Sequence, residues 1–397
     1  MSRCRSCVLP IDEYVEHEDG MCLACKAYMP PSANQKPSFD AGRAEVEELV
    51  RSFRGKGKNY DVLVPLTGGK DSMFALHMLA QFEPRPRMAA FTVENGFTHK
   101  QALANIQGGL KATGVPHIIY DYGQSDGAGA RLYGGLFRLF GTPCVGCRLL
   151  LPLVVPLGAI DAGAPLIISA STGGQGGVDL KRGLVNEKRS IRPYFEFFSR
   201  ILRMVARRSM SEGGEQFVGD LDRLKTHLDR PEQEWPSSLV LGTYVDWNVN
   251  EEKVVQSLAD DFGFEKPQPL IGHTSCHLSP LRGHLETKRR HLYGKRGSIL
   301  EQMKRMFGVG RLEAEVSEYV RTGLLTRDEG LRELEALGVI GPPPVAIIED
   351  FCRGAGLSLD EFKTYSSQRL PKLNSDWLRV SYYYLSSLLG AGGRSAA

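Results

Sequence analysis

The sequence lacks two features that would decide its class at once, a long apolar run and a strong charge bias. No stretch of about 18 apolar residues stands out, and the N-terminal Met1-Ser2-Arg3-Cys4 has no apolar segment of a signal peptide. We therefore expect a cytoplasmic protein with no membrane partner. The 49 Lys and Arg nearly balance the 46 Asp and Glu. This balance argues against a dedicated nucleic-acid-binding protein, although a local basic patch could still contact nucleic acid.

Cysteine is scarce, but its eight positions are clustered: Cys4, Cys7, Cys22, Cys25, Cys144, Cys147, Cys276 and Cys352. In a reducing compartment, clustering favours metal or redox chemistry over disulfides. The first four form two Cys-x2-Cys knuckles, which can arrange four thiolates tetrahedrally around Zn²⁺. A module of about thirty residues has too little core to fold without such a centre. We predict a structural zinc ribbon in residues 1–30, with redox thiols or an iron centre as the alternatives.

The chain also lacks a Walker motif, yet it has a candidate phosphate loop. An apolar run over residues 61–66 ends in Gly68-Gly69, and an amphipathic stretch follows, which predicts strand, tight loop and helix. Glycines let the backbone approach an anion, while helix N–H groups, Lys70 and Ser72 can hold phosphates. Lys70 precedes Asp71 and no glycine stands at the earlier Walker position, so the P-loop NTPases are excluded. The expected nucleotide-binding residues are Leu66, Thr67, Gly68, Gly69, Lys70, Asp71 and Ser72.

The stretch Thr67-Gly68-Gly69-Lys70-Asp71-Ser72 resembles the signature of the PP-loop ATP pyrophosphatases, usually Ser-Gly-Gly-Lys-Asp-Ser. The resemblance implies a Rossmann-like PP-loop fold and cleavage of ATP, with Mg²⁺, between its α and β phosphates. It further implies that a nitrogen or sulfur nucleophile displaces an AMP-activated oxygen. The structural alternative is an ordinary strand-to-helix turn.

Further apolar runs alternate with helical patterns, which predicts an α/β fold with a parallel sheet. The other strand candidates are residues 88–93, 117–120, 166–169 and 239–245. Ligands bind at the carboxyl ends of such strands, where the loops 67–71, 94–97 and 169–177 lie. We expect these loops to supply further nucleotide contacts from Val93, Asn95, Ser169, Thr172 and Gly173, although 169–177 could also be a mobile surface loop. The predicted domains are the ribbon, a PP-loop domain over residues 40–280, and a mainly helical region over 281–397.

Over nearly its whole length the chain resembles the N-acetyl sugar amidotransferases of bacterial surface-polysaccharide synthesis. Besides the PP-loop, the matching stretches are Cys4-x2-Cys7-Val8-Leu9-Pro10, Gly20-Met21-Cys22, Val93-Glu94-Asn95-Gly96-Phe97, Trp247-Asn248, Gly263-Phe264 and Arg321-Thr322-Gly323-Leu324-Leu325-Thr326-Arg327-Asp328-Glu329. This resemblance implies that nitrogen replaces an ATP-activated acetamido oxygen to give an amidine. No glutaminase nucleophile is evident, so a separate glutaminase subunit would deliver the ammonia.

Cys144-x2-Cys147 and the distant Cys276 depart from that pattern. They resemble the three-cysteine set of the iron–sulfur-dependent tRNA thiolases, which are also PP-loop enzymes. That resemblance implies a [4Fe–4S] cluster on three thiolates, with one iron open for incoming sulfur. The thiols could instead act without a cluster, as a persulfide carrier and resolving thiols, or be buried structural cysteines. His273 and His277 flank Cys276 and could join a zinc site.

The three cysteines decide between sulfur and nitrogen as the nucleophile, because nitrogen transfer from ammonia needs no thiolates. The sequence therefore predicts an ATP-dependent sulfur transferase that adenylates a carbonyl or amide-type oxygen of a small-molecule acceptor. The expected catalytic residues are Lys70, Asp71, Cys144, Cys147 and Cys276. Sugar amidotransferase, tRNA thiolase and a non-enzymatic nucleotide-binding scaffold are the alternatives. A sulfur donor or carrier is the expected partner, and the chain could form a homodimer.

Overall fold

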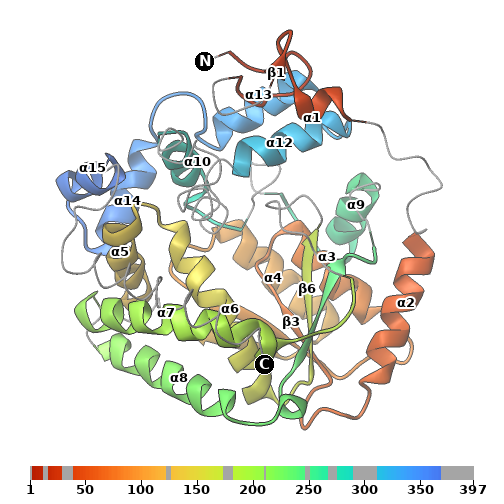
Figure 1. Ribbon diagram of the computed structural model, residues 1–397. Helices are drawn as coiled ribbons and strands as arrows, with labels where there is room; N and C mark the ends of the chain where they lie inside the picture. The colour runs from red at the N-terminus through yellow and green to blue at the C-terminus, as the bar shows by residue number, and fades with distance from the viewer. Residues whose placement is uncertain are drawn as a thin grey trace, which may run out of the picture.

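The fold is a sheet-centred α/β domain to which short N-terminal elements and C-terminal helices are added (Figure 1). In this computed structural model, the residues described are 2–11, 17–28, 39–121, 127–172, 182–209, 212–245, 251–266, 275–288 and 311–367.

Six strands form the central sheet in the order β5-β4-β3-β6-β8-β7. Their bounds are β3 (Val62–Pro65), β4 (Met88–Glu94), β5 (His117–Asp121), β6 (Leu166–Thr172), β7 (Val185–Asn186) and β8 (Ser237–Gly242). All neighbours pair in parallel except β7, which is antiparallel to β8. The parallel α/β sheet predicted from the sequence is thus confirmed. The chain runs outward from β3 through β4 to β5 and then returns to β6, so the order reverses beside β3, where such sheets bind ligands.

Helices cover both faces of this sheet. Val62 and Val64 point to one face, where they pack with α2 (Phe39–Ser52), α3 (Lys70–Ala80), α4 (Lys100–Thr113) and α9 (Glu251–Phe262). Leu63 points to the other face and packs with α6 (Cys144–Ala162). Beyond α6 lie α5 (Ala128–Phe140), α7 (Glu187–Ser209), α8 (Glu212–Leu228) and the short 3-10 helix η1 (Glu232–Glu234). Because alternate residues of β3 are apolar on both faces, the strand is buried from both sides.

Helix α7 is amphipathic. Its apolar residues Phe198, Ile201, Leu202 and Val205 are all buried. The opposite face carries arginines, of which Arg203 pairs with Asp222 at 2.9 Å.

The remaining elements come from the two ends of the chain. The N-terminal ones are β1 (His17–Glu18), β2 (Met21–Cys22) and α1 (Leu23–Lys26), and the C-terminal ones are α10 (Ser279–Lys288), α12 (Arg311–Arg321), α13 (Arg327–Ala336), α14 (Val345–Ala355) and α15 (Leu359–Ser367). In Figure 1, β1 and α1 lie beside α12 and α13, whereas α14 and α15 lie beside α5. Cys352 on α14 is buried in the core. The expected domain boundary at residue 280 falls inside α10.

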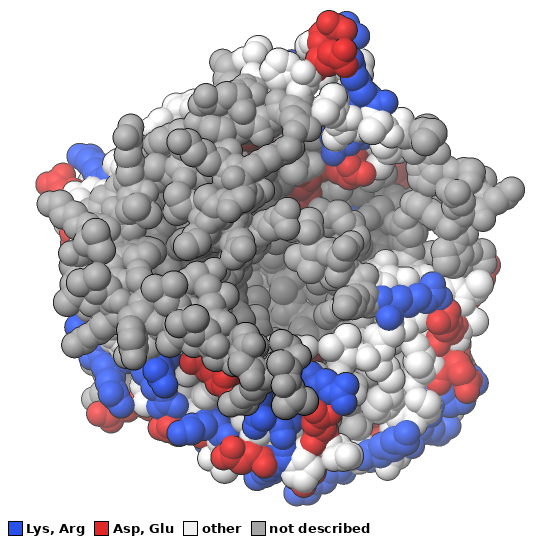
Figure 2. Space-filling view, in the orientation of Figure 1, with Lys and Arg blue, Asp and Glu red and all other residues white. Residues whose placement is uncertain are grey.

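One helix differs from the expectation that the chain has no long apolar segment. Among the described helices, α6 alone is long and apolar enough to cross a membrane, with a mean hydropathy of 1.7. Within the fold, 59% of that apolar window is buried, as in the core helix of a soluble domain. Figure 2 shows Lys and Arg interspersed with Asp and Glu along the lower rim of the molecule, in keeping with the balanced net charge.

Candidate functional site

The predicted phosphate loop connects β3 to α3. Gly68 in this loop has a φ of +73°, a left-handed conformation that glycine adopts without strain. A Cβ at Gly68 would lie 2.1 Å from the carbonyl oxygen of Ala102 on α4. Both the backbone conformation and the space therefore require glycine, and the loop lies directly against α4.

Hydrogen bonds within the loop hold its shape. The Ser72 hydroxyl donates to the Gly69 carbonyl at 3.0 Å and accepts from the Thr67 N–H at 3.2 Å. Lys70 Nζ lies 3.5 Å from Asp71 Oδ1. Gly69 is the N-cap of α3 and supplies no side-chain cap, so the N–H groups of the first turn suit an anion. Ser72 was expected to contact phosphate, and in the structure its hydroxyl orders the loop.

A buried asparagine that the sequence analysis missed fastens the loop to its surroundings. Asn105 on α4 is 1% exposed, and its Nδ2 donates to the carbonyls of Gly68 at 3.1 Å and Glu265 at 2.9 Å. Its Oδ1 accepts from the Glu265 N–H at 3.0 Å and from Gln101 Nε2 at 3.3 Å. All four hydrogen-bonding positions of the amide are thus used. An asparagine on a helix gives no sequence signal of such a role.

The loop after β4 points toward the cysteines. Asn95 Oδ1 accepts from the Phe97 N–H at 2.9 Å, which fixes the amide. Asn95 Nδ2 then donates to the Tyr133 hydroxyl at 2.9 Å and lies 3.6 Å from Cys147 Sγ. Asn95 was expected to contact the nucleotide, whereas in the structure its side-chain amide donates to Tyr133 and lies beside Cys147, in the thiol site.

The structure brings Cys144, Cys147 and Cys276 into one neighbourhood. The first two lie in the first turn of α6. Cys276 forms an antiparallel bridge with Thr98, just after the β4 loop. Cys147 and Cys276 pack against the same hydrophobic cluster. Burial raises the pKa of the Cys276 thiol, and the nearby Cys147 and Cys144 raise it further. The sequence separation alone could not show this convergence.

Several donors surround Cys147. The Tyr133 hydroxyl lies 3.0 Å from Cys147 Sγ. Burial raises the pKa of Cys147, while Tyr133, the charge of Arg282 and the Asn95 amide oppose that rise. Arg282, on α10, also lowers the pKa of Cys276. The sequence analysis assigned no role to Arg282 and did not identify Tyr133 or its helix α5.

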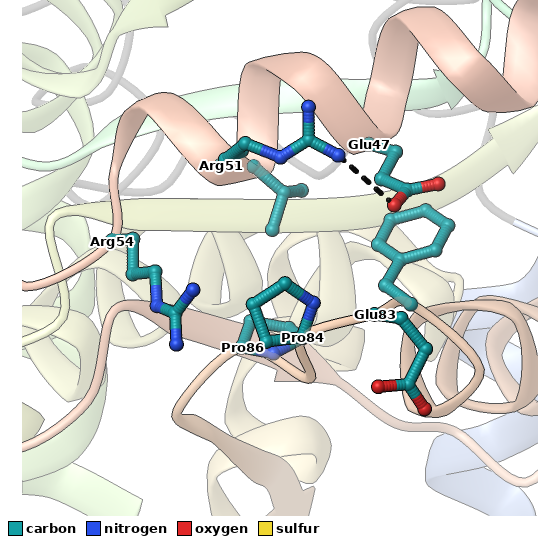
Figure 3. A pocket seen from close by; sticks show the side chains of 8 residues that line it. Glu47, Arg51, Arg54, Glu83, Pro84 and Pro86 are labelled. Atoms are coloured by element: carbon teal, nitrogen blue, oxygen red, sulfur yellow. Dashed lines mark hydrogen bonds and ion pairs between the residues drawn. The ribbon is translucent and has the colours of Figure 1, made fainter.

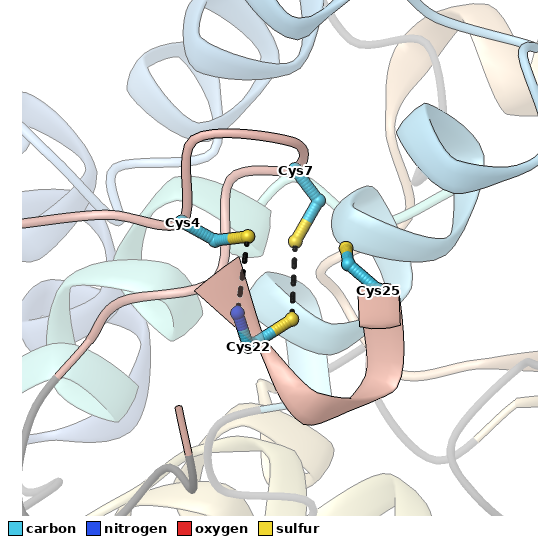
Figure 4. A group of neighbouring side chains, drawn as sticks. All are labelled: Cys4, Cys7, Cys22 and Cys25. Atoms are coloured by element: carbon cyan, nitrogen blue, oxygen red, sulfur yellow. Dashed lines mark hydrogen bonds between the residues drawn. The ribbon is translucent and has the colours of Figure 1, made fainter. Parts of the chain in front are cut away.

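The four N-terminal cysteines form a compact group (Figure 4). Their Sγ atoms all lie within 4.8 Å of one another, and Cys7 Sγ is 3.8 Å from Cys22 Sγ. A tetrahedral Zn²⁺ with Zn–S bonds of 2.3 Å separates its sulfurs by about 3.8 Å, so the group fits one metal ion. Burial raises the pKa of Cys4, but N–H groups of Cys22, Cys7 and Ser6 outweigh it and lower that pKa to about 6.

This four-cysteine module docks on α12 and α13. Arg321 Nη1 lies 3.7 Å from Cys7 Sγ, and Arg327 Nε donates to the Cys4 carbonyl at 3.1 Å. Arg3 pairs with Glu313 at 3.1 Å, with side chains only 9% and 5% exposed. Val8 lies in the hydrophobic cluster of the two helices. The C-terminal motif that begins at Arg321 therefore contacts the four-cysteine module through Arg321 and Arg327.

The two cysteine groups differ in what they could hold. Among the described residues, the four N-terminal cysteines form the group that is compact enough to bind a single metal ion. In a [4Fe–4S] cluster each thiolate binds a different iron, so the three thiols around Cys147 need not be that close.

Several expected site residues, or their side chains, lie outside the described part of the chain. Ser169 and Thr172 lie in β6, next to β3, but the Thr172 side chain is outside the described part. Gly173, Trp247, Asn248 and His273 also lie outside the described residues. Val93 lies in β4 and packs against the core clusters on both sides of α6.

A small cavity elsewhere is too small for a nucleotide (Figure 3). It lies between α2 and the turn before β4, is lined by Arg51, Phe82 and Pro84 among others, and has a volume of about 10 Å³. That volume suits at most one water molecule. The cavity is separate from the phosphate loop and the thiols.

Comparison with known families gives one match in the C-terminal part. Residues 302–386 match the C-terminal domain of the WbpG-like lipopolysaccharide biosynthesis proteins. This region includes α12, α13, α14 and α15, and therefore the helices that hold the four-cysteine module.

Two individual proteins are also similar. The uncharacterized protein MJ1599 of Methanocaldococcus jannaschii is 28% identical over 132 residues, which cover 33% of this chain and 44% of that protein. The match thus spans less than half of that relative's length. The U34-tRNA thiolase NcsA of Methanococcus maripaludis, solved with its [4Fe-4S] cluster, gives a TM-score of 0.33 at 14% identity, covering 84% of this chain and 89% of that one. At this TM-score the likeness supports no functional argument.

Proposed function

We propose that the chain is an ATP-dependent sulfur transferase that adenylates a carbonyl or amide-type oxygen of a small-molecule acceptor and replaces it with sulfur. The observation that carries the proposal is the convergence of Cys144, Cys147 and Cys276 at the same edge of the sheet as the phosphate loop. A nucleotide loop beside three thiols suits activation and sulfur delivery in one site.

The phosphate loop supplies the activation half of this reaction. The acceptor oxygen attacks the α-phosphorus of ATP, and pyrophosphate leaves. The backbone N–H groups around Gly68 and Gly69, with the Lys70 ammonium, stabilise the charge that develops on the leaving group. Mg²⁺ would neutralise charge on the phosphates, and the Asp71 carboxylate would be the protein group that holds it.

The three thiols supply the transfer half. Sulfide held there attacks the adenylated carbon, AMP leaves with the former acceptor oxygen, and the carbon gains a C–S bond in place of its C–O bond. If a cysteine persulfide attacks instead, a second thiol of the site cleaves the resulting S–S bond, and an external thiol must then reduce the protein disulfide that forms. Cys144, Cys147 and Cys276 fit a [4Fe–4S] cluster because three thiolates leave one iron open to bind sulfur. The Arg282 charge and the Tyr133 and Asn95 hydrogen bonds suit anionic sulfur here. Zn²⁺ in the N-terminal module is structural in this proposal.

A second candidate is an N-acetyl sugar amidotransferase that uses ammonia from a separate glutaminase. The observation that favours it is the match of residues 302–386 to lipopolysaccharide biosynthesis proteins. The same match favours a sugar or another small metabolite over a tRNA as the acceptor in either reaction.

Metal and sulfide analysis of anaerobically purified protein tests the proposal. We expect about one zinc, four iron and four acid-labile sulfide per chain, with the absorption of an iron–sulfur centre. Cys276→Ala should lose the iron and keep the zinc. Cys352→Ala removes a buried core thiol instead and should keep both.

The acceptor reaction separates the two candidates. Sulfide-dependent formation of AMP and pyrophosphate with a sugar amide supports sulfur transfer. Zinc alone after anaerobic reconstitution, together with ammonia-dependent AMP formation, would reject the sulfur proposal and establish the amidotransferase.

A further inference from the structure

A short chain of hydrogen bonds ends on the sulfur of Cys147. Asn95 Nδ2 lies 2.9 Å from the Tyr133 hydroxyl, which lies 3.0 Å from Cys147 Sγ. Asn95 Nδ2 also lies 3.6 Å from the same sulfur. The three residues come from the β4 loop, α5 and α6, and all three elements therefore meet at this thiol.

The amide of Asn95 sets the direction of the first hydrogen bond, and the ionisation of Cys147 sets that of the second. Asn95 Oδ1 accepts from the Phe97 N–H at 2.9 Å, so the NH₂ group of the amide must face Tyr133. An NH₂ group only donates, so the Tyr133 oxygen accepts from it. A Cys147 thiolate or a cluster-ligating sulfur carries no proton, so in that state the Tyr133 hydroxyl donates to Cys147 Sγ. The deprotonated sulfur is then the final acceptor, and the donated hydrogen bond stabilises its negative charge.

The Tyr133 ring is held in a slot that suits this role. Tyr133 is 2% exposed, and its ring lies 5.4 Å from that of Phe97. On the other side is Gly146, the residue before Cys147, where a Cβ would lie 2.5 Å from Tyr133 Cε1. A glycine at this position therefore lets the ring lie against α6 and its hydroxyl reach the sulfur.

We infer that Tyr133 and Asn95 are positioning residues of the three-thiol site, which hold Cys147 Sγ in one orientation by donating hydrogen bonds to it. The inference rests on the proposed sulfur-handling role of Cys147. It assigns Asn95 to the sulfur half of the site rather than to ATP. Donors to a ligating sulfur also raise the reduction potential of the cluster that it holds.

The test compares Tyr133→Phe with Tyr120→Phe. Both changes remove one hydroxyl from a tyrosine packed on the same core, but the Tyr120 hydroxyl donates to Asp220, away from the thiols. In anaerobic protein, Tyr133→Phe and Asn95→Ala should lower the reduction potential of the cluster, whereas Tyr120→Phe should leave it unchanged. The Kd for ATP should stay at the wild-type value in Asn95→Ala. An unchanged potential in Tyr133→Phe, or a weakened ATP Kd with an unchanged potential in Asn95→Ala, would overturn the inference.

If the wild-type protein holds no iron, the cluster of the proposed function is rejected, but the inference about Tyr133 and Asn95 is not. A second measurement then tests that inference. In that protein, iodoacetamide labelling of Cys147 is measured by peptide mass spectrometry with Cys144 as the internal reference. Tyr133→Phe should change the Cys147 to Cys144 ratio by about two- to tenfold, the range that one hydrogen bond gives. A ratio that differs from that of Tyr120→Phe by less than twofold would overturn the inference. Gly146→Ala, which displaces the ring but keeps its hydroxyl, should change the ratio as Tyr133→Phe does.

Discussion

The buried carboxylate of Asp61 accepts hydrogen bonds from donors that belong to other segments of the chain. Asp61, just before β3, is fully buried. Its carboxylate accepts from the Gly57 N–H at 3.1 Å and from Arg87 Nη2 at 2.7 Å. Burial raises the pKa of Asp61, but Arg87 and the backbone donors outweigh it, so the pKa lies below its usual value. The ionised form is therefore the one that stabilises the fold.

Asp61 should give the protein a pH-dependent stability. Because its pKa is lower in the folded protein than in the unfolded chain, its contribution is present above about pH 4 and is lost as the pH falls. Asp61→Asn should lower the free energy of unfolding by about 1–3 kcal/mol at pH 7, and by less at pH 3. Urea denaturation at both pH values measures this, with Asp260→Asn as the exposed control. An equal loss at both pH values would contradict the prediction.

Residue patterns gave a prediction for the chemistry of the loops, but not for the contacts around them. The Gly68-Gly69-Lys70 sequence predicts a phosphate loop, because two glycines and a lysine directly after a buried strand are typical of phosphate binding. Asn105 and Tyr133 gave no such signal, because a polar residue on a helix usually faces solvent. Their roles depend on which helix packs beside which loop, and that is decided by the tertiary fold.

At the scale of elements, the phosphate loop depends on the close approach of α4. Gly68→Ala should weaken ATP binding by at least tenfold, because a Cβ would meet the Ala102 backbone and the φ of +73° would be strained. Gly114→Ala is the matched control. Gly114 also has a positive φ, of +64°, but has nothing within 4 Å of a Cβ, so it should cost about 1–2 kcal/mol of stability and leave ATP binding unchanged. Isothermal titration with a non-hydrolysable ATP analogue measures both variants, and equal affinities would contradict the role of α4.

The parallel strands were predictable because each is a short run rich in apolar residues. β3 and β4 are buried almost throughout, whereas β5 is partly exposed. β7 was not predictable, because two residues at the sheet edge carry no periodicity. α5 was missed as well. Its apolar residues Leu132, Leu136 and Phe137 do recur at helical spacing and are fully buried, so a search of residues 128–140 for that period could have found it.

At the scale of the whole molecule, the first and last parts of the chain form one structure. The sequence indicated a self-contained ribbon, because paired knuckles are typical of such modules. In the structure the module packs on α12 and α13 through Val8, Arg3 and Arg321. Thr326 and Glu329 form the capping box that begins α13, which gives part of the C-terminal motif a structural reason. The segments are about 300 residues apart, a separation over which local patterns give no information.

This docking predicts that metal in the four-cysteine module stabilises α12 and α13. Cys22→Ser should remove the zinc and with it the fold of residues 2–11, because that segment has few contacts of its own beyond the thiols and the two helices. Glu313 would then lose Arg3, and breaking such a buried pair costs about 3–5 kcal/mol. Hydrogen exchange in residues 311–336 should therefore accelerate, while α3 and α4 keep their protection.

Cys352→Ala, which removes a thiol far from the module, should leave exchange in 311–336 unchanged. Arg3→Ala in the zinc-loaded protein separates docking from metal binding, since it should accelerate exchange in α12 with the zinc retained. Unchanged exchange in Cys22→Ser would show that α12 and α13 are stable without the module.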